Sequence, residues 1–336
     1  MTKHNPDSKD RLHISQKHMT VHAGFDVGGT SVKAGLFSDE TEKPFLLTKR
    51  SVPFPGADYR KLALCVKELT CDMLAEQGLT ERELASVGAA VPGSLDRERS
   101  LVIDASNLGY HNAPIKQAIS EFFPGVPVYL ENDANAAALA ELYAGAFRGA
   151  QTAVLLTLGT GVGGGIILNG RLFDGGMGHG IELGHMCLIH GGALCSCGNR
   201  GCIETVCAAT WLSAQGRNAL CAGDHGELFR RTNGDPDHVS AEIVIESAKA
   251  GDAAAEAIFC DYVDHLSSAV LSVIALLDPE VVAIGGGVSL AGDFLFQPLR
   301  EKVNEGAFYP CEYRIVPAEL GNDAGIAGAA MLHRMR

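Results

Sequence analysis

Short apolar runs bounded by turn residues alternate along the chain with longer stretches whose apolar residues recur at helical spacing. The runs predict strands and the stretches predict helices. In the first half, strands are expected at 21–26, 32–37, 86–91 and 126–130, and helices at 59–77 and 134–144. In the second half, strands are expected at 153–158, 165–169 and 281–284, and helices at about 253–277 and 324–334. This alternation indicates an α/β fold.

Two α/β cycles follow one another, and each opens with strands and a glycine-rich turn. The pattern is compatible with two similar domains and a cleft between them, and such clefts are favoured ligand sites. We expect a flexible tail at 1–20, a small N-terminal α/β domain at 21–133 and a large α/β domain at 134–321. The C-terminal helix, at about 322–336, is expected to pack back on the small domain.

The composition is that of a globular protein, with 46% hydrophobic and 20% charged residues among 336. The formal net charge of −13 argues against a nucleic acid partner. The longest uncharged run, 149–170, is long enough to cross a bilayer but is rich in glycine, so we expect no membrane span. The first twenty residues lack the apolar core of a signal peptide, which favours a cytoplasmic location.

The first glycine turn follows a predicted strand and leads into another, so it is expected to be a tight hairpin. Its residues are Asp26, Val27, Gly28, Gly29 and Thr30. Such a turn can present backbone N–H groups to an anion, and Asp26 can hold Mg²⁺ through water. An ordinary glycine hairpin explains the same residues equally well.

Two further glycine clusters also follow predicted strands. The first, Gly159–Gly165, begins with Gly159, Thr160 and Gly161 and formally matches the dinucleotide fingerprint, but the residues after it predict a strand where that fingerprint needs a helix. A second phosphate turn fits better, and two such turns would hold one polyphosphate from both sides. The other cluster, Gly285, Gly286 and Gly287, can admit a base or ribose against bare backbone. No Gly-Lys pair is present, which excludes a Walker A loop.

Asn132 and Asp133 lie where a predicted strand gives way to a helix. Either residue type is expected there merely as a helix cap. The functional interpretation is that Asp133 is a general base that takes a proton from a substrate hydroxyl, with Asn132 on a neighbouring hydroxyl. Phosphoryl transfer needs positioned reactants, charge neutralisation and such a base.

A histidine and three cysteines form a Cys₃His set, which is typical of structural Zn²⁺. The four residues are His185, Cys195, Cys197 and Cys202. A disulfide would require an oxidising compartment, and the remaining cysteines are expected to be core or surface thiols. Glu182 and Glu204 bracket the set and are suited to accept hydrogen bonds from sugar hydroxyls.

Taken together, these motifs resemble the ROK family of bacterial sugar kinases and repressors, within the hexokinase and actin-like ATPase superfamily. The resemblance covers nearly all of residues 21–336. Its elements are Asp-Val-Gly-Gly-Thr at 26–30, Glu-Asn-Asp-Ala-Asn at 131–135, Leu-Gly-Thr-Gly-Val-Gly-Gly-Gly at 158–165, the Glu-Leu-Gly-His and Cys-x-Cys-Gly-x-x-Gly-Cys-x-Glu signature at 182–204, and Gly-Gly-Gly-Val at 285–288.

The resemblance implies an ATP-dependent hexose kinase with two actin-like (ribonuclease H-like) domains, a central cleft, structural Zn²⁺ and a homodimeric state. It implies transfer from Mg-ATP to the 6-hydroxyl of a hexose. Glucose is the preferred substrate, with mannose, allose, fructose and N-acetylhexosamines as alternatives and polyphosphate as an alternative donor.

The resemblance also implies a role for each matching position, with Asp133 as the base. The two earlier glycine turns would hold phosphates and the Gly285 turn the adenosine. The residues that would hold the sugar are Asn107, Asn132, Glu182, His185 and Glu204, with Pro92-Gly93 as a weaker sugar contact. Lys33 is interpreted as an exposed strand residue.

Two other classes are less favoured. The family's sugar-sensing repressors carry a helix-turn-helix domain before the first glycine turn, whereas only 25 residues precede Asp26 here, with no paired helical pattern. A dinucleotide enzyme built on Gly159–Gly164, with Glu182 as the ribose acid, would lack its helix and leave the zinc set unexplained.

Overall fold

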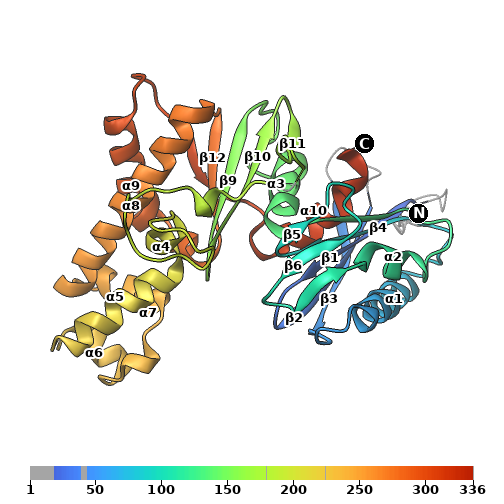
Figure 1. Ribbon diagram of the computed structural model, residues 1–336, viewed down its shortest axis with the longest axis horizontal. Helices are drawn as coiled ribbons and strands as arrows, with labels where there is room; N and C mark the ends of the chain where they lie inside the picture. The colour runs from blue at the N-terminus through green and yellow to red at the C-terminus, as the bar shows by residue number, and fades with distance from the viewer. Residues whose placement is uncertain (1–18, 39–43, 179, 224, 336) are drawn as a thin grey trace, which may run out of the picture.

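A computed structural model describes residues 19–38, 44–178, 180–223 and 225–335. The expected tail at 1–20 therefore lies almost wholly outside the described residues. The molecule is elongated, with the sheet of the first half of the chain at one end and the helices of the second half at the other (Figure 1).

The first sheet has five strands in the order β3-β2-β1-β4-β8. The pairs β3-β2 and β2-β1 are antiparallel, whereas β1-β4 and β4-β8 are parallel. One face packs on two helices, α1 and α2, and their contact forms the apolar core of this half. The bounds are β1 Val21–Val27, β2 Ser31–Ser38, β3 Phe45–Pro53, β4 Leu84–Val91, β8 Val128–Asn132, α1 Tyr59–Glu76 and α2 Ile115–Ser120.

The second sheet repeats this design strand for strand, in the order β11-β10-β9-β12-β13. Its first three strands are again antiparallel and its last two pairs parallel. The turns β1–β2 and β9–β10, which carry the first two glycine clusters, therefore occupy equivalent positions. The bounds are β9 Ala153–Leu158, β10 Val162–Leu168, β11 Arg171–Phe173, β12 Val281–Gly285 and β13 Ile315–Pro317.

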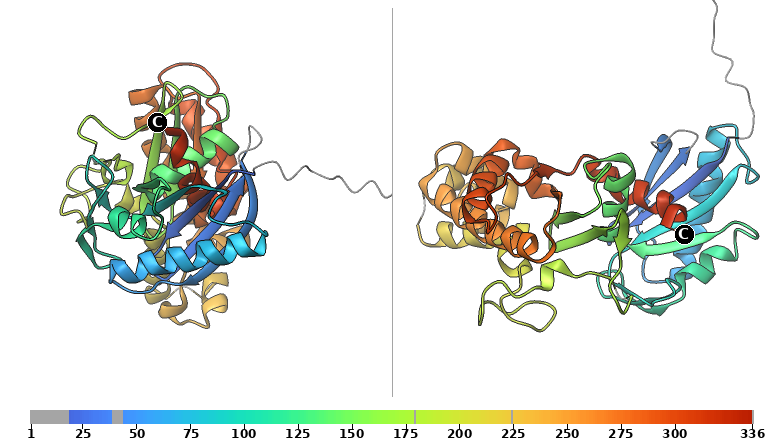
Figure 2. Two further views of the ribbon diagram at one scale, coloured as in Figure 1. Left: turned by 90° about the vertical axis from the view of Figure 1, so that its right-hand side faces the viewer. Right: turned by 90° about the horizontal axis from the view of Figure 1, so that it is seen from above.

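Additional elements extend both halves. The first half carries a small antiparallel sheet, and the second carries a set of helices that pack on one face of its sheet (Figures 1 and 2). The bounds are β5 Ser94–Leu95, β6 Val102–Ala105, β7 Tyr110–Ala113, α4 Glu204–Cys207, α5 Ala209–Cys221, α6 Glu227–Thr232, α7 Ala241–Lys249, α8 Ala253–Leu277 and α9 Asp293–Gly306. Short 3₁₀ turns are η1 Leu183–His185, η2 Pro236–His238, η3 Gly287–Ala291, η4 Gly321–Asp323 and η5 Leu332–Met335.

The α/β prediction is confirmed, and two of its details change. β10 begins at Val162 and not at Gly165, so Gly163 and Gly164 also lie inside the strand. Gly165 belongs there because a Cβ would approach the Cβ of Ala138 to 2.5 Å, and only glycine allows a helix so close to the strand. The sequence pattern also did not predict β3, the small sheet, or helices α5, α6, α7 and α9.

α8 is the one helix among the described residues that is long and apolar enough to cross a membrane. Its apolar residues, among them Phe259, Tyr262 and Leu266, are buried in the core of the second half. The apolar residues of α8 pack against the neighbouring helices α4, α5, α7 and α9.

Two helices cross between the halves. α3 (Asp133–Ala144) follows the last strand of the first sheet but packs on β9 and β10 of the second. α10 (Ala324–Met331) follows the last strand of the second sheet but packs on β1 and β4 of the first. The two helices also pack on each other in the middle of the molecule (Figure 1).

Small residues make this crossing possible. A Cβ at Gly328 would overlap the carbonyl oxygen of Ala136, and a Cβ at Gly88 would overlap that of Ala329. Backbones in such contact leave no room for a side chain, which explains the run of alanine and glycine in both helices.

We expect Gly328→Ala to destabilise the protein by roughly 1–3 kcal/mol or more, because the added methyl group must separate α3 from α10. The higher helix propensity of alanine offsets only about 1 kcal/mol. Thermal unfolding measures the change, with Gly176→Ala as the control, because a Cβ at Gly176 meets nothing within 4 Å. Equal melting temperatures for Gly328→Ala and the wild type would contradict the close contact.

Candidate active site

A cleft of about 1320 Å³ opens between the two halves, and both contribute to its lining. Most of the residues singled out from the sequence lie on its walls. They are Asp26, Asn107, Asn132, Asp133, Gly159, Thr160, Gly161, Glu182, His185, Cys197, Glu204, Gly285, Gly286 and Gly287. The described lining does not include Gly28, Gly29 or Thr30, which form the turn beside Asp26, or Cys195 and Cys202, which lie behind the wall.

Asp133 is the first residue of α3, and its position is set by the cap of that helix. The side chain of Asn132 accepts hydrogen bonds from the backbone N–H groups of Ala134 and Asn135, at 2.9 and 3.2 Å. Burial, assisted by the negative charges of Asp26 and Glu182, raises the pKa of Asp133 to about 6. Such a carboxylate is ionised at neutral pH but more basic than an ordinary aspartate, as a general base requires.

Asp26 is the penultimate residue of β1, before the first glycine turn, and it pairs with Lys33 on β2. Their side chains lie 3.6 Å apart, and burial raises the pKa of Asp26 despite the lysine. Lys33 lies on a strand as expected, but its side chain lines the cleft. Gly325, at the start of α10, approaches this carboxylate so closely that a Cβ would lie 2.6 Å from the Asp26 Cγ.

The second and third glycine turns lie against each other. Gly286 has a φ of 84°, and a Cβ there would overlap the backbone of Leu158, the residue before the second turn. At Gly161 a Cβ would overlap the carboxylate of Glu204. Because glycine stands there, Glu204 Oε2 comes within 3.0 Å of the backbone N–H of Val162 and accepts its hydrogen bond.

The proposed sugar residues face the cleft from both halves. Burial raises the pKa of Glu182, and the charge of Glu204 adds to this effect, while His185 opposes it. From the other half, Asn132 Nδ2 donates to the backbone oxygen of Gly93 at 3.2 Å, so the Pro92-Gly93 turn also lines the cleft. This arrangement offers a polar ligand acceptors and donors on two sides.

The Cys₃His set forms one cluster. The ligand atoms of its members all lie within 4.8 Å of one another. Cys197 Sγ and Cys202 Sγ are 3.7 Å apart, and Cys195 Sγ is 3.5 Å from His185 Nδ1. Tetrahedral Zn²⁺ with Zn–S bonds of about 2.3 Å separates its sulfur ligands by about 3.8 Å, so the donors fit that ion.

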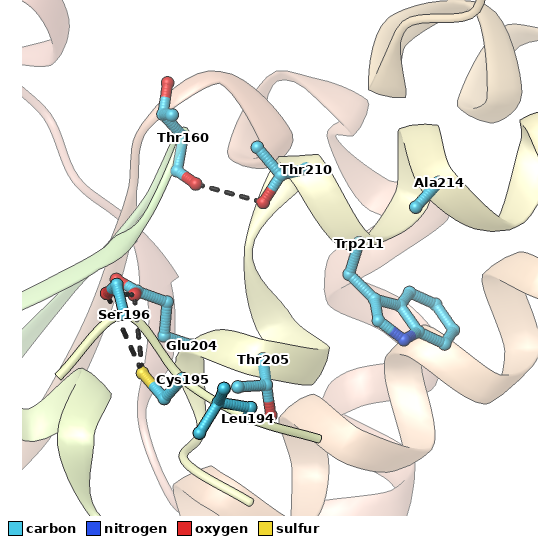
Figure 3. Close-up of a pocket in the computed structure, with 9 residues that line it drawn as sticks. All are labelled: Thr160, Leu194, Cys195, Ser196, Glu204, Thr205, Thr210, Trp211 and Ala214. Carbon is cyan, nitrogen blue, oxygen red and sulfur yellow. Dashed lines mark hydrogen bonds between the residues drawn. The ribbon is translucent and has the colours of Figure 1, made fainter. Parts of the chain in front are cut away.

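A second cavity, of about 270 Å³, lies behind Glu204 (Figure 3). Trp211 and Leu194 form part of its wall, and Thr210 Oγ1 donates to the backbone oxygen of Thr160 at 3.1 Å. Glu204, Thr160 and Ser196 line both this cavity and the main cleft.

Several cleft residues were not expected from the sequence. Asp104 and Ser106 belong to the small sheet and the turn after it, which the apolar pattern did not reveal. Gly321 and Asn322 precede α10, and the run Gly321-Asn322-Asp323 before an apolar helix is a helix-start signal that marks this segment.

Two sheets of equivalent strand order, each with a glycine turn at a shared cleft, define the actin-like class of two-domain α/β proteins. The chain belongs to the ROK family, whose sequence profile matches residues 22–336. The resemblance inferred from the motifs is thus confirmed.

Individual relatives agree with this assignment. A glucokinase of Thermotoga maritima is 37% identical, over 93% of this chain and 97% of the relative. The crystal structure of a ROK family glucokinase from Streptomyces griseus in complex with glucose and AMPPNP superposes with a TM-score of 0.78 at 30% identity, over 94% of this chain and 100% of that one. The crystal structure of a ROK family transcriptional regulator, a homologue of the E. coli MLC protein, superposes with a TM-score of 0.82 at 25% identity. The match covers 94% of this chain and 78% of the regulator.

The raised pKa of Asp133 has a consequence for stability. Its pKa is about 6 in the folded protein and near 3.8 when unfolded, so the folded state binds this proton more tightly. Stability is therefore lost as the pH rises from about 4 to 6, by up to about 3 kcal/mol.

We expect Asp133→Asn to raise the melting temperature at pH 7, because an amide carries no charge into the cleft. The advantage should vanish near pH 4, where the wild-type carboxyl is protonated in the folded protein. Thermal unfolding at both pH values measures it, with Asp72→Asn on the exposed face of α1 as the control. A variant less stable than the wild type at pH 7 would contradict this account.

Proposed function

We propose that this protein is an ATP-dependent glucose kinase, which transfers the terminal phosphoryl group of ATP to the 6-hydroxyl of glucose. Its similarity to glucokinases over nearly the whole chain supports the activity. The observation that carries the chemical assignment is Asp133, whose elevated pKa and place at the cleft suit it to accept the hydroxyl proton.

In the proposed reaction, Asp133 accepts the proton of the sugar hydroxyl as that oxygen attacks the terminal phosphorus. The new O–P bond forms, the bond to the ADP oxygen breaks, and its electron pair leaves with ADP. The sugar is held by Asn107, Asn132, Glu182, His185 and Glu204. Mg²⁺ would neutralise charge on the phosphates when bound, with Asp26 as its acceptor through water.

The nucleotide is assigned to the glycine turns. Backbone N–H groups of the turns Gly28–Thr30 and Gly159–Gly161 would hold the phosphates, and the bare backbone of Gly285–Gly287 would admit the adenosine. Support comes from the equivalent positions of the first two turns in the two sheets. Because its phosphates would contact both turns, the nucleotide would hold the two halves of the molecule in a fixed relative position.

We further propose that His185, Cys195, Cys197 and Cys202 bind structural Zn²⁺, supported by the mutual distances of their ligand atoms. The domain boundaries proposed are 133/134 and 321/322, supported by the exchange of α3 and α10 between the sheets. A homodimeric state and a cytoplasmic location are proposals that rest on the resemblance to the family's kinases.

Substrate choice is tested by ADP release from Mg-ATP with glucose, mannose, allose, fructose, N-acetylglucosamine and N-acetylmannosamine. We expect glucose to give the highest kcat/KM. A preferred acetylated sugar would reassign the substrate, and no activity with any sugar, or with polyphosphate as donor, would favour a sensor.

The role of Asp133 is tested separately. Asp133→Asn should lower kcat by roughly 10² or more, and the wild-type kcat/KM should decrease as the pH falls below about 6, because the base becomes protonated.

Zinc is tested by elemental analysis and by chelation. We expect one Zn²⁺ per chain. We expect its removal to lower the melting temperature and raise the KM for glucose, because the proposed zinc loop, residues 185–204, carries both His185 and Glu204. Cys197→Ser should reproduce the loss, whereas Cys311→Ser, an exposed thiol outside the cluster, should not. An unchanged KM after verified removal of the metal would refute the link to the sugar site.

A further inference from the structure

Arg99 occupies an unusual position in the turn between β5 and β6. Its φ of 51° lies in the left-handed region that non-glycine residues rarely adopt. Its side chain is only 12% exposed, although arginine is seldom buried unless it is paired. Such a residue persists only where its surroundings hold it firmly, so its contacts call for an explanation.

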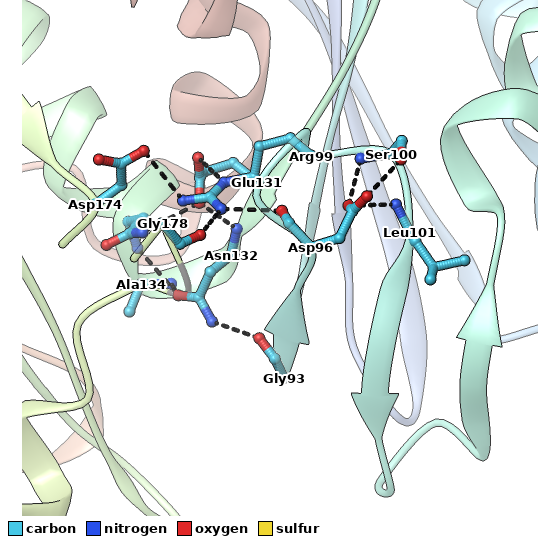
Figure 4. Close-up of polar contacts among 11 residues, drawn as sticks. Gly93, Asp96, Arg99, Ser100, Leu101, Glu131, Asn132, Ala134, Asp174 and Gly178 are labelled. Carbon is cyan, nitrogen blue, oxygen red and sulfur yellow. Dashed lines mark hydrogen bonds and ion pairs between the residues drawn. The ribbon is translucent and has the colours of Figure 1, made fainter. Parts of the chain in front are cut away.

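One guanidinium group joins three segments of the chain (Figure 4). Arg99 Nε donates to Glu131 Oε2 at 2.9 Å, at the end of β8. Nη1 donates to the backbone oxygen of Asp96 in its own turn, at 3.2 Å, and to that of Gly178. Nη2 lies 3.5 Å from Asp174 Oδ2. Asp174 and Gly178 belong to the second half of the molecule, so the group bridges the halves.

The first arm of this bridge leads to the start of α3. Glu131 is 2% exposed, and its Oε1 accepts hydrogen bonds from the backbone N–H of Asn132 at 2.9 Å and from Asn135 Nδ2 at 3.1 Å. The same carboxylate that Arg99 neutralises thus holds the turn of chain from which Asp133 projects.

The second arm leads to Glu182. Residues 174–178 follow β11 and lie just before Ile181 and Glu182 in the chain. The turn is folded on itself, since Gly178 N–H donates to the backbone oxygen of Gly175 at 3.2 Å and Gly180 N–H to that of Asp174 at 3.0 Å. Holding Gly178 and Asp174 therefore restricts where the chain places Glu182.

We propose that Arg99 is a positioning residue that sets the placement of Glu182 relative to Asp133 across the cleft, and through it the affinity for the sugar. The inference rests on the proposed sugar kinase function. Arg99 does not itself line the cleft, so it acts through Glu131 on one side and through residues 174–178 on the other.

A merely structural arginine would behave differently from a positioning one. Neutralising Glu131 needs only a positive charge, which lysine supplies. Spanning Glu131, Gly178 and Asp174 at once needs the planar fork of the guanidinium, which lysine lacks. Arg99→Lys therefore separates the two roles. Asp174→Ala removes one of the two contacts that Arg99 makes with the second half and leaves the backbone oxygen of Gly178 in place.

The experiment compares wild type, Arg99→Lys, Asp174→Ala and the double variant. We expect Arg99→Lys to keep a near-wild-type melting temperature but to raise the KM and the calorimetric Kd for glucose about 10-fold, since small misplacements at a reacting centre cost up to about 10². The KM for ATP should not change. Asp174→Ala should raise the glucose constants in the same direction, and the double variant should be no worse than Arg99→Lys, because both act through one link.

Arg50→Lys is the matched control. Arg50 also pairs with a glutamate, Glu76, but both lie on the outer part of the first half. The Arg50→Lys variant should leave the KM and the calorimetric Kd for glucose unchanged.

Hydrogen exchange gives a readout that needs no sugar. We expect the amides of Gly178 and Gly180 to exchange faster in Arg99→Lys and Asp174→Ala than in the wild type. If both variants keep wild-type exchange and wild-type glucose constants, Arg99 only compensates charge and the proposal is wrong. If the wild type neither binds nor phosphorylates glucose, the proposed function fails, and unchanged exchange in both variants would then refute the link on its own.

Discussion

The contact between α3 and α10 is the constraint on which the rest of the structure depends. Each helix leaves its own sheet and packs on the other, and their backbones touch at Gly328 and Ala136. Because only glycine and alanine fit there, the two halves are joined through a narrow, side-chain-poor crossing. α3 begins with Asp133 and α10 contacts Asp26 through Gly325, so the same crossing places both carboxylates at the cleft.

The cleft concentrates negative charge that the fold alone does not neutralise. Asp26, Asp133 and Glu182 all have raised pKa values, with burial as the main cause. Lys33 relieves Asp26 only in part. Burying these carboxylates therefore costs free energy, and ligands that donate hydrogen bonds or positive charge recover part of it on binding. The same burial that lowers stability also makes Asp133 a base strong enough for proton transfer.

Sequence reasoning succeeded where a motif lies at the end of a strand. Asp26, Asp133 and the glycine turns follow apolar runs, and the α/β order brings such ends to one cleft. It failed where the decisive contact is distant in sequence. Nothing near Gly328 reveals that Ala136 will touch it, and nothing near Arg99 reveals the carboxylate and carbonyl groups that surround it. Likewise, the local sequence placed Gly163 in a turn, whereas in the structure it lies within β10, close to Ala134 of α3.

The carboxylate of Glu204 is hydrogen-bonded to two separate parts of the site. One of its oxygens accepts from Val162 at the second glycine turn, and the other accepts from Ser196 in the loop of the Cys₃His cluster, at 3.2 Å. Under the proposed assignment, a sugar that draws this carboxylate toward itself also moves the turn that holds phosphate. Binding free energies are reciprocal, so the nucleotide must then change the affinity for the sugar by the same factor as the sugar changes that for the nucleotide. A single carboxylate shared by two sites would thereby make the affinities for sugar and nucleotide interdependent.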